Sequence, residues 1–142
     1  MNLTGRAIVP LMVLWLGGCQ VSQSAAPRPT SVVPKTGMGV LRGKLAPIPE
    51  PWRGKELFAY AATYLGPSGG EGVFVLDANL HPKATLDSQG WFQIVDIRPG
   101  PYVLVLGPDP DNASAFRKDG KAIKFQVEAG EVVDVGTISL PP

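Results

Sequence analysis

The sequence predicts an all-β protein, a sandwich of seven to eight short antiparallel strands. Glycine and proline are frequent, with 17 and 15 copies in 142 residues. Both residues disfavour helix interiors and suit tight turns. From Gly39 onward, short apolar runs alternate with turn residues at a spacing of roughly 8–12 residues, which is typical of sandwiches and barrels. No segment long enough to form a helix repeats its apolar residues with the helical period, and no segment resembles a β-α-β unit.

Three strands are predicted in the first part of this region, separated by loops rich in glycine and proline. Residues 40–45 alternate apolar and polar side chains, as expected for a strand with one buried face. Residues 57–65 follow, and their aromatic side chains at 58, 60 and 64 share one face by the two-residue period. Residues 73–78 are expected to form the third strand.

A hairpin is predicted next, in which residues 83–86 pair with residues 91–97. Gly90 is placed for the left-handed position that closes a type I turn with a bulge, and Asp87 can accept hydrogen bonds from the turn's backbone amides. Residues 102–106 are apolar on both faces, which indicates a central strand.

Two further strands are expected at the end of the chain. Residues 122–127 follow a long loop over 107–121 and alternate apolar with polar side chains. Residues 132–140 form the last predicted strand, after a turn at 129–131.

Residues 1–18 are predicted to be a lipoprotein signal peptide. Arg6 provides a positive start, and the apolar run over 7–16 is shorter than the roughly 20 residues that a membrane-spanning helix needs. The run ends in the sequence Leu-Gly-Gly-Cys at 16–19, which resembles the lipobox of bacterial lipoproteins.

The resemblance implies that Cys19 carries a thioether-linked diacylglycerol and becomes the new N-terminus. Two or more acyl chains give stable anchoring where one would be marginal. The alternative is an ordinary secretory signal with Cys19 incidental. Cys19 is the only cysteine of the chain, and a free thiol outside the cytoplasm would be a liability, so lipidation is favoured. The expected location is extracytoplasmic, with the protein anchored by lipid to the cell membrane or the outer membrane. In Gram-negative bacteria an aspartate after the lipidated cysteine retains a lipoprotein in the inner membrane, and Gln20 at this position favours the outer membrane.

Residues 19–38 are expected to be the lipidated cysteine and a disordered tether. Serine, alanine, proline and threonine dominate it, and no hydrophobic period is present, so it cannot bury enough apolar surface to become ordered. As a flexible coil it would average about 25 Å from end to end. The predicted domain then spans residues 39–142.

A family resemblance covers this whole domain and is strongest over residues 84–106, ATLDSQGWFQIVDIRPGPYVLVL. The stretch resembles the signature of carboxypeptidase regulatory-like, transthyretin-like domains, although Leu86 interrupts its Thr-Asp pair. The matching residues are Asp87, Gly90, Phe92, Ile97, Pro99, Gly100 and Tyr102. The resemblance implies an immunoglobulin-like or transthyretin-like antiparallel sandwich that serves as an accessory, adhesion or spacer module. Fold analogy alone does not assign an activity.

Candidate catalytic and metal-binding residues are few. His81 is the single histidine, whereas zinc sites and the enzymes of related fold use several ligands or histidines. The loop that holds Asp109, Asp111, Asn112 and Asp119 could offer oxygen ligands, but its spacing does not fit a calcium loop. A Lys–Asn cross-link from Lys44 is not expected, because residues 127–140 contain no asparagine. No catalytic residue, metal or cofactor is therefore predicted.

The formal net charge is only +1, and no basic cluster is present, so nucleic acid is not an expected partner. Trp52 and Trp91 could stack on sugars or fill a core, and because Trp91 precedes Phe92 on a strand, one of these two must point outward. The sequence predicts a non-catalytic binding or structural module, held to membrane lipid and contacting an envelope protein or glycan. The alternative is a hydrolase-type enzyme with an unrecognised site on the sandwich loops.

Overall fold

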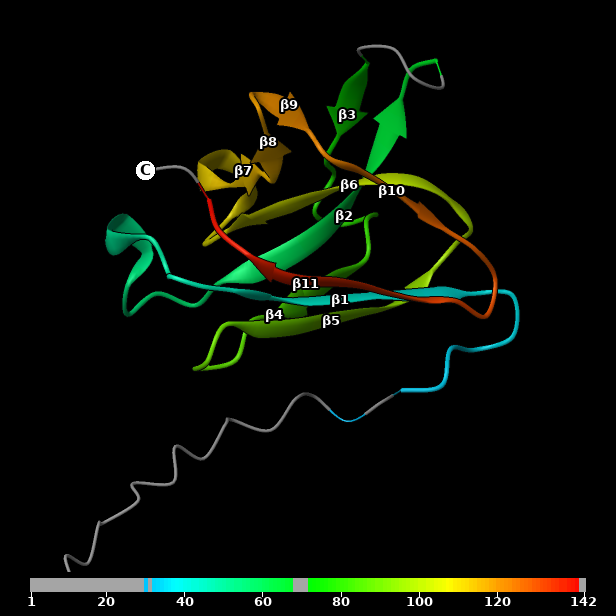
Figure 1. The fold of residues 1–142 in the computed structure, drawn as a ribbon, viewed down its shortest axis with the longest axis horizontal. Helices are drawn as coiled ribbons and strands as arrows, with labels where there is room; N and C mark the ends of the chain where they lie inside the picture. The colour runs from blue at the N-terminus through cyan, green and yellow to red at the C-terminus, as the bar shows by residue number, and fades with distance from the viewer. Residues whose placement is uncertain (1–29, 31, 68–71, 141–142) are drawn as a thin grey trace, which may run out of the picture.

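The structure of the chain is a computed structural model that describes residue 30 and residues 32–67 and 72–140. Within these residues the protein is an all-β sandwich, which confirms the predicted fold class (Figure 1). The strands of three residues or more are β1 (Gly39–Leu45), β2 (Phe58–Leu65), β3 (Val73–Val75), β4 (Lys83–Thr85), β5 (Trp91–Ile97), β6 (Gly100–Gly107), β10 (Lys124–Val127) and β11 (Val132–Ile138). The shorter elements are η1 (Glu50–Trp52), η2 (Pro110–Asn112), β7 (Ser114–Ala115), β8 (Arg117–Lys118) and β9 (Lys121–Ala122).

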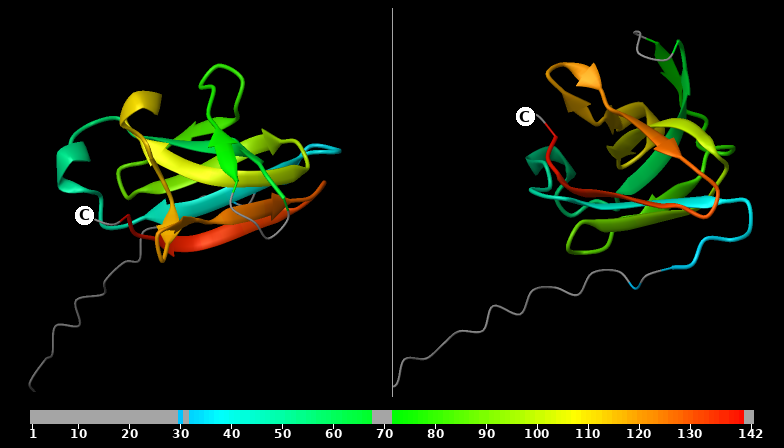
Figure 2. Two further views of the ribbon diagram at one scale, coloured as in Figure 1. Left: turned by 90° about the horizontal axis from the view of Figure 1, so that it is seen from above. Right: turned by 45° about the vertical axis from the view of Figure 1, so that its right-hand side comes forward.

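Two sheets face each other, as the two views of Figure 2 show. The smaller sheet has the strand order β11-β1-β5, and the larger has the order β10-β6-β2-β3, with β4 and β7 pairing at its sides. Strands β8 and β9 form a separate small hairpin. Every described pair is antiparallel except β1 with β11, which is parallel. The chain crosses from β10 in the larger sheet to β11 in the smaller one. Strand β11 is therefore not joined to β1 by a hairpin turn, which would have made the two strands antiparallel.

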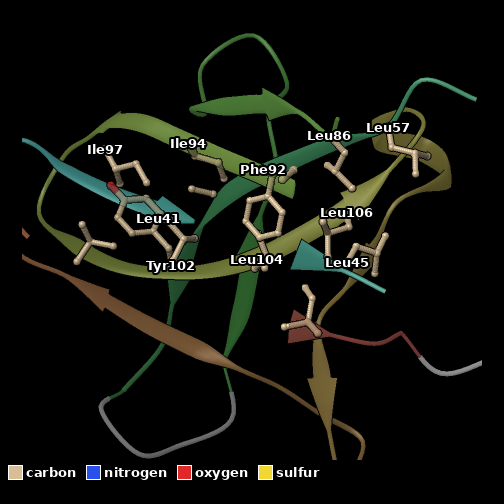
Figure 3. Packing of buried hydrophobic residues seen from close by; sticks show 14 residues of the cluster. Leu41, Leu45, Leu57, Leu86, Phe92, Ile94, Ile97, Tyr102, Leu104 and Leu106 are labelled. Carbon is tan, nitrogen blue, oxygen red and sulfur yellow. The ribbon is translucent and has the colours of Figure 1, made fainter. Parts of the chain in front are cut away.

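The main core lies between the two sheets. Its buried members come from both sheets and the turns beside them, and they are Leu41, Leu45, Leu57, Ala59, Ala61, Leu86, Phe92, Ile94, Ile97, Tyr102, Leu104, Leu106, Val127 and Ile138. Phe92 on β5 is 1% exposed and points toward Leu104 on β6 (Figure 3). Phe92 and Tyr102, two of the residues that carry the family resemblance, therefore both belong to the core.

Strand β6 is central, as predicted, with β2 on one side and β10 and β7 on the other. Its inward side chains belong to the main core, whereas Val103 and Val105 belong to a second cluster on the outer face of the larger sheet. Tyr60 and Tyr64 lie in the same cluster, with Phe58 packed against it, so the three aromatic side chains of β2 share one face. The larger sheet is buried on both faces, which explains why β6 has no polar alternation.

The predicted hairpin between residues 83–86 and 91–97 is wrong in its pairing. Strand β4 pairs with β2 in the larger sheet, and β5 pairs with β1 in the smaller one. Leu86 donates its backbone N–H to the Leu57 carbonyl oxygen and buries its side chain in the core. The turn at Asp87–Gly90 therefore carries the chain from one sheet to the other, because burying Leu86 requires β4 to stay beside β2.

The turn itself has the predicted geometry. Gly90 has a φ of 83° and donates its N–H to the Asp87 carbonyl oxygen, at a distance of 2.9 Å between nitrogen and oxygen. Asp87 Oδ1 accepts hydrogen bonds from the backbone N–H groups of Gln89 and Trp91. A carboxylate that holds the amides of its own turn is the interaction that favours aspartate there.

Strand β3 is shorter than the predicted 73–78 and ends at Val75. The next residues form a turn, in which His81 and Leu80 donate their N–H groups to the Asp77 carbonyl oxygen. Leu76 and Ala78 pack instead against the second cluster on the outer face of the larger sheet. These two residues therefore bury their side chains on that face instead of continuing the pairing of β3 with β2.

Candidate binding face on the three-stranded sheet

The outer face of the small sheet carries a group of polar and aromatic side chains. Strand alternation sends the side chains of Leu41 and Leu45 into the core and their neighbours outward. The register then places the outward residues of β5, β1 and β11 in two rows across the strands. We call this surface the Trp91 face, and its residues are Arg42, Lys44, Trp91, Gln93, Asp134 and Thr137.

Trp91 and Lys44 form the first row of this face together with Thr137. Because Phe92 points into the core, Trp91 is the outward ring of the pair, and it is half-buried. Lys44 lies directly across from it on β1, and the Lys44 Nζ atom stands 5.4 Å from the centroid of the indole ring. The ring thus meets a cation over its electron-rich face.

Two polar atoms at the base of the face have no hydrogen-bond partner within the described residues. They are the indole Nε1 of Trp91 and the amide Oε1 of Gln93, and both are shielded from solvent. The two residues are two positions apart on β5, so their side chains leave the same face. One atom is a donor and the other an acceptor, and each unmade hydrogen bond of this kind costs about 1–3 kcal/mol.

The second row joins Gln93 to an ion pair. Arg42 lies opposite Gln93 on one side and opposite Asp134 on the other, and its Nε atom is 3.0 Å from the Asp134 Oδ2 atom. The charges of this pair offset each other. In the described part of the chain, no ion pair involves Lys44.

The end of the face beyond these rows is apolar and is covered by the predicted tether. Val40 points outward yet is fully buried, and it lines a small pocket of about 170 Å³ with Val95 and residues 32–35. The Lys35 Nζ atom is 2.6 Å from the Asp96 Oδ2 atom. Asp96 has a φ of 58° at a bulge in β5, and a bulge of this kind re-aims a side chain. Residues 35–38 of the predicted tether are therefore fastened to the domain.

Trp52 does not contribute to this face. It ends the short helix η1 and packs against the main core as a partly buried side chain. Of the two tryptophans that the sequence singled out, the structure assigns Trp52 to packing and leaves Trp91 on a surface.

His81 is held within its own turn and beside β2. Its Nδ1 atom lies 2.8 Å from the backbone nitrogen and 3.0 Å from the carbonyl oxygen of Asp77, and its Nε2 atom lies 2.9 Å from the Thr63 hydroxyl oxygen. The tautomer of the ring sets which of its nitrogens donates. Both ring nitrogens are thus used by the fold.

The oxygen-rich loop is also internally satisfied. Asp109 Oδ1 accepts hydrogen bonds from the backbone N–H groups of Asp111 and Asn112, and the Asn112 amide holds both carboxylate oxygens. The hydrogen bond from the Asn112 side chain is the main reason why the pKa of Asp109 is lowered. Within the described ranges, no three His, Cys, Asp or Glu side chains are grouped so as to hold a metal ion.

Cys19 and the signal peptide lie outside the described residues, so the lipidation site stays a prediction from sequence. None of the helices in the described ranges combines the length and the apolar character needed to cross a membrane. Sequence reasoning named Trp91 but not Arg42, Gln93 or Asp134 as site residues. The polar alternation of β1 and β5 was a signal for an outward face, but it could not show which strands would lie side by side.

Comparison with known proteins finds a likeness among solved structures. No family model and no curated protein matches the chain. Among solved structures, the chain is similar to a proposed carbohydrate-binding protein of Pseudomonas aeruginosa, with 17% identity and a TM-score of 0.36. The match covers 76% of this chain and 92% of the Pseudomonas chain.

Proposed function

We propose that the protein is a lipoprotein anchored outside the cytoplasm through Cys19, whose sandwich domain binds a glycan on the Trp91 face without catalysis. The observation that carries the binding role is the outward, half-buried indole of Trp91 with the Lys44 Nζ atom 5.4 Å from its ring centroid. An aromatic ring with an adjacent ammonium donor suits a ligand that has both an apolar ring face and hydroxyl groups.

The arrangement of the domain supports a surface role. The chain enters the sandwich at Gly39, which lies opposite Ile97 at one end of β5, and Trp91 lies at the other end. Six residue steps along a strand correspond to about 20 Å. A domain tethered through its N-terminus would therefore hold the Trp91 face away from the point of attachment.

Binding is tested by applying the purified protein to an array of bacterial envelope and extracellular glycans. We expect the protein to bind a subset of the array and the Trp91→Ala variant to lose that binding. Leu80→Ala is the matched control, because Leu80 is 80% exposed and lies away from the face. Retention of glycan binding by the Trp91→Ala variant would contradict the assignment of the site.

The anchor is tested separately with the Cys19→Ala variant. We expect the wild-type chain to sediment with membranes and to carry a lipidated N-terminal peptide in mass spectrometry. The variant should remain unprocessed at this position and lack the lipid. Normal cleavage between Gly18 and residue 19 in the variant would refute lipidation-dependent processing.

A further inference from the structure

The charge distribution of the Trp91 face indicates which class of sugar it takes, an inference that rests on the glycan-binding function proposed above. We propose that the face selects a sugar that carries a carboxylate. In this arrangement Trp91 stacks on the sugar ring and Lys44 pairs with the acid group.

The two cations of the face differ in their partners. Arg42 is 3.0 Å from Asp134 and is neutralised by it. Lys35 and Asp96, at the covered end of the sheet, neutralise each other as well. Lys44 takes part in no ion pair within the described residues, so the face has one uncompensated positive charge.

This positive charge lies where a stacked ligand would bind. The Lys44 Nζ atom is 5.4 Å from the centroid of the Trp91 ring, and the indole is the partner that the described residues give it. A sugar that stacks on this side of the ring takes the place of the ammonium group. A neutral sugar would displace the cation without replacing its interaction, whereas a carboxylate would give it a new partner.

The indole favours a sugar over an acidic peptide side chain. A sugar has an apolar ring face that can stack on the outward ring of Trp91 and a carboxylate that can pair with Lys44. An aspartate or glutamate side chain has the carboxylate but no ring, so it would leave the indole uncovered.

The test compares two saccharides that differ only at their carboxyl groups, tetragalacturonate and its uncharged methyl ester, by calorimetry at low ionic strength. We expect the acid to bind roughly two- to fivefold more tightly than the ester, the range of a solvent-exposed ion pair. The Lys44→Gln variant should bind both saccharides with equal affinity. The indole N–H resonance of Trp91, identified by its loss in Trp91→Phe, should shift with either saccharide.

The matched control is Lys83→Gln. Lys83 also holds its Nζ atom over an aromatic ring, 5.5 Å from the centroid of Phe58, but it lies on β4 of the larger sheet. This variant should keep the preference for the acid. Added salt should reduce the preference in the wild type and leave the binding of the ester unchanged.

Four results would overturn the inference. Equal affinity of the wild type for both saccharides, or a preference that survives in Lys44→Gln, would remove the role of charge and leave the glycan-binding function intact. Binding of polyglutamate as tightly as tetragalacturonate would replace the sugar by an acidic peptide. Failure of the wild type to bind either saccharide would overturn this inference, whereas the glycan-binding function would fall only if the glycan array showed no binding as well.

Discussion

Replacing Gly90 by alanine tests how the turn at Asp87–Gly90 joins the two sheets. Gly90 has a φ of 83°, a conformation that costs an alanine about 1–2 kcal/mol. An added Cβ would also fall well inside van der Waals contact of the Leu45 carbonyl oxygen, which is backbone and cannot rotate away. The turn and β1 would have to separate.

The cost of that separation can be worked from the contacts at this point. Leu45 donates its backbone N–H to the Gly90 carbonyl oxygen at 2.9 Å, and losing this hydrogen bond costs about 1 kcal/mol. Leu45 is 1% exposed, so moving it disturbs packing by a further 1–3 kcal/mol, the usual range of overpacking. Together with the conformational cost, we expect Gly90→Ala to lower the free energy of unfolding by about 3–6 kcal/mol.

Gly120→Ala is the control, because it separates the conformational cost from the overlap. Gly120 has a φ of 76°, and an added Cβ there would meet nothing within 4 Å. Part of its conformational cost is offset because alanine also restricts the unfolded chain. We expect this variant to lose about 1 kcal/mol or less.

Urea denaturation followed by tryptophan fluorescence measures both variants. With a slope of about 1.5 kcal/mol per M, the midpoint should fall by about 2–4 M for Gly90→Ala and by less than about 1 M for Gly120→Ala. Equal midpoints for the two variants would refute the reasoning, since the overlap with Leu45 would then carry no cost.

Two further predictions follow from the contacts of single side chains. Tyr102 donates its hydroxyl hydrogen to the Arg98 carbonyl oxygen at 2.8 Å, so Tyr102→Phe should lower the free energy of unfolding by about 1 kcal/mol in urea denaturation at neutral pH. Burial raises the pKa of Tyr102 above the ordinary value of 10.0, so the folded state keeps the proton longer and stability falls as the pH rises above about 10. This alkaline loss should be smaller in Tyr102→Phe, and an identical pH dependence in both proteins would contradict the role of Tyr102. The ion pair of Lys35 and Asp96 is largely exposed, so Lys35→Ala should change the free energy of unfolding by less than about 0.5 kcal/mol. The same variant should speed amide hydrogen exchange over residues 35–38. Unchanged exchange there would show that the ion pair does not hold the predicted tether to the domain.

The sequence predicted those features that depend on short-range rules. The alternation of β1 identified Arg42 and Lys44 as outward, and Asp87 with Gly90 identified a turn whose hydrogen bonds the structure contains. The apolar character of residues 102–106 identified the central strand. These patterns arise from the two-residue period of a strand and from the φ of one residue, so neighbouring residues are enough to specify them.

Strand partners and the composition of the face were decided only by the tertiary structure. Strand β4 pairs with β2 because Leu86 is buried beside Leu57, although β5 follows it directly along the chain. Asp134 reaches Arg42 across 92 positions of sequence because β11 returns parallel to β1. The polar pattern of one strand specifies which of its side chains face outward. Its neighbouring strands are determined by the packing of both sheets, which must bury their apolar faces against each other.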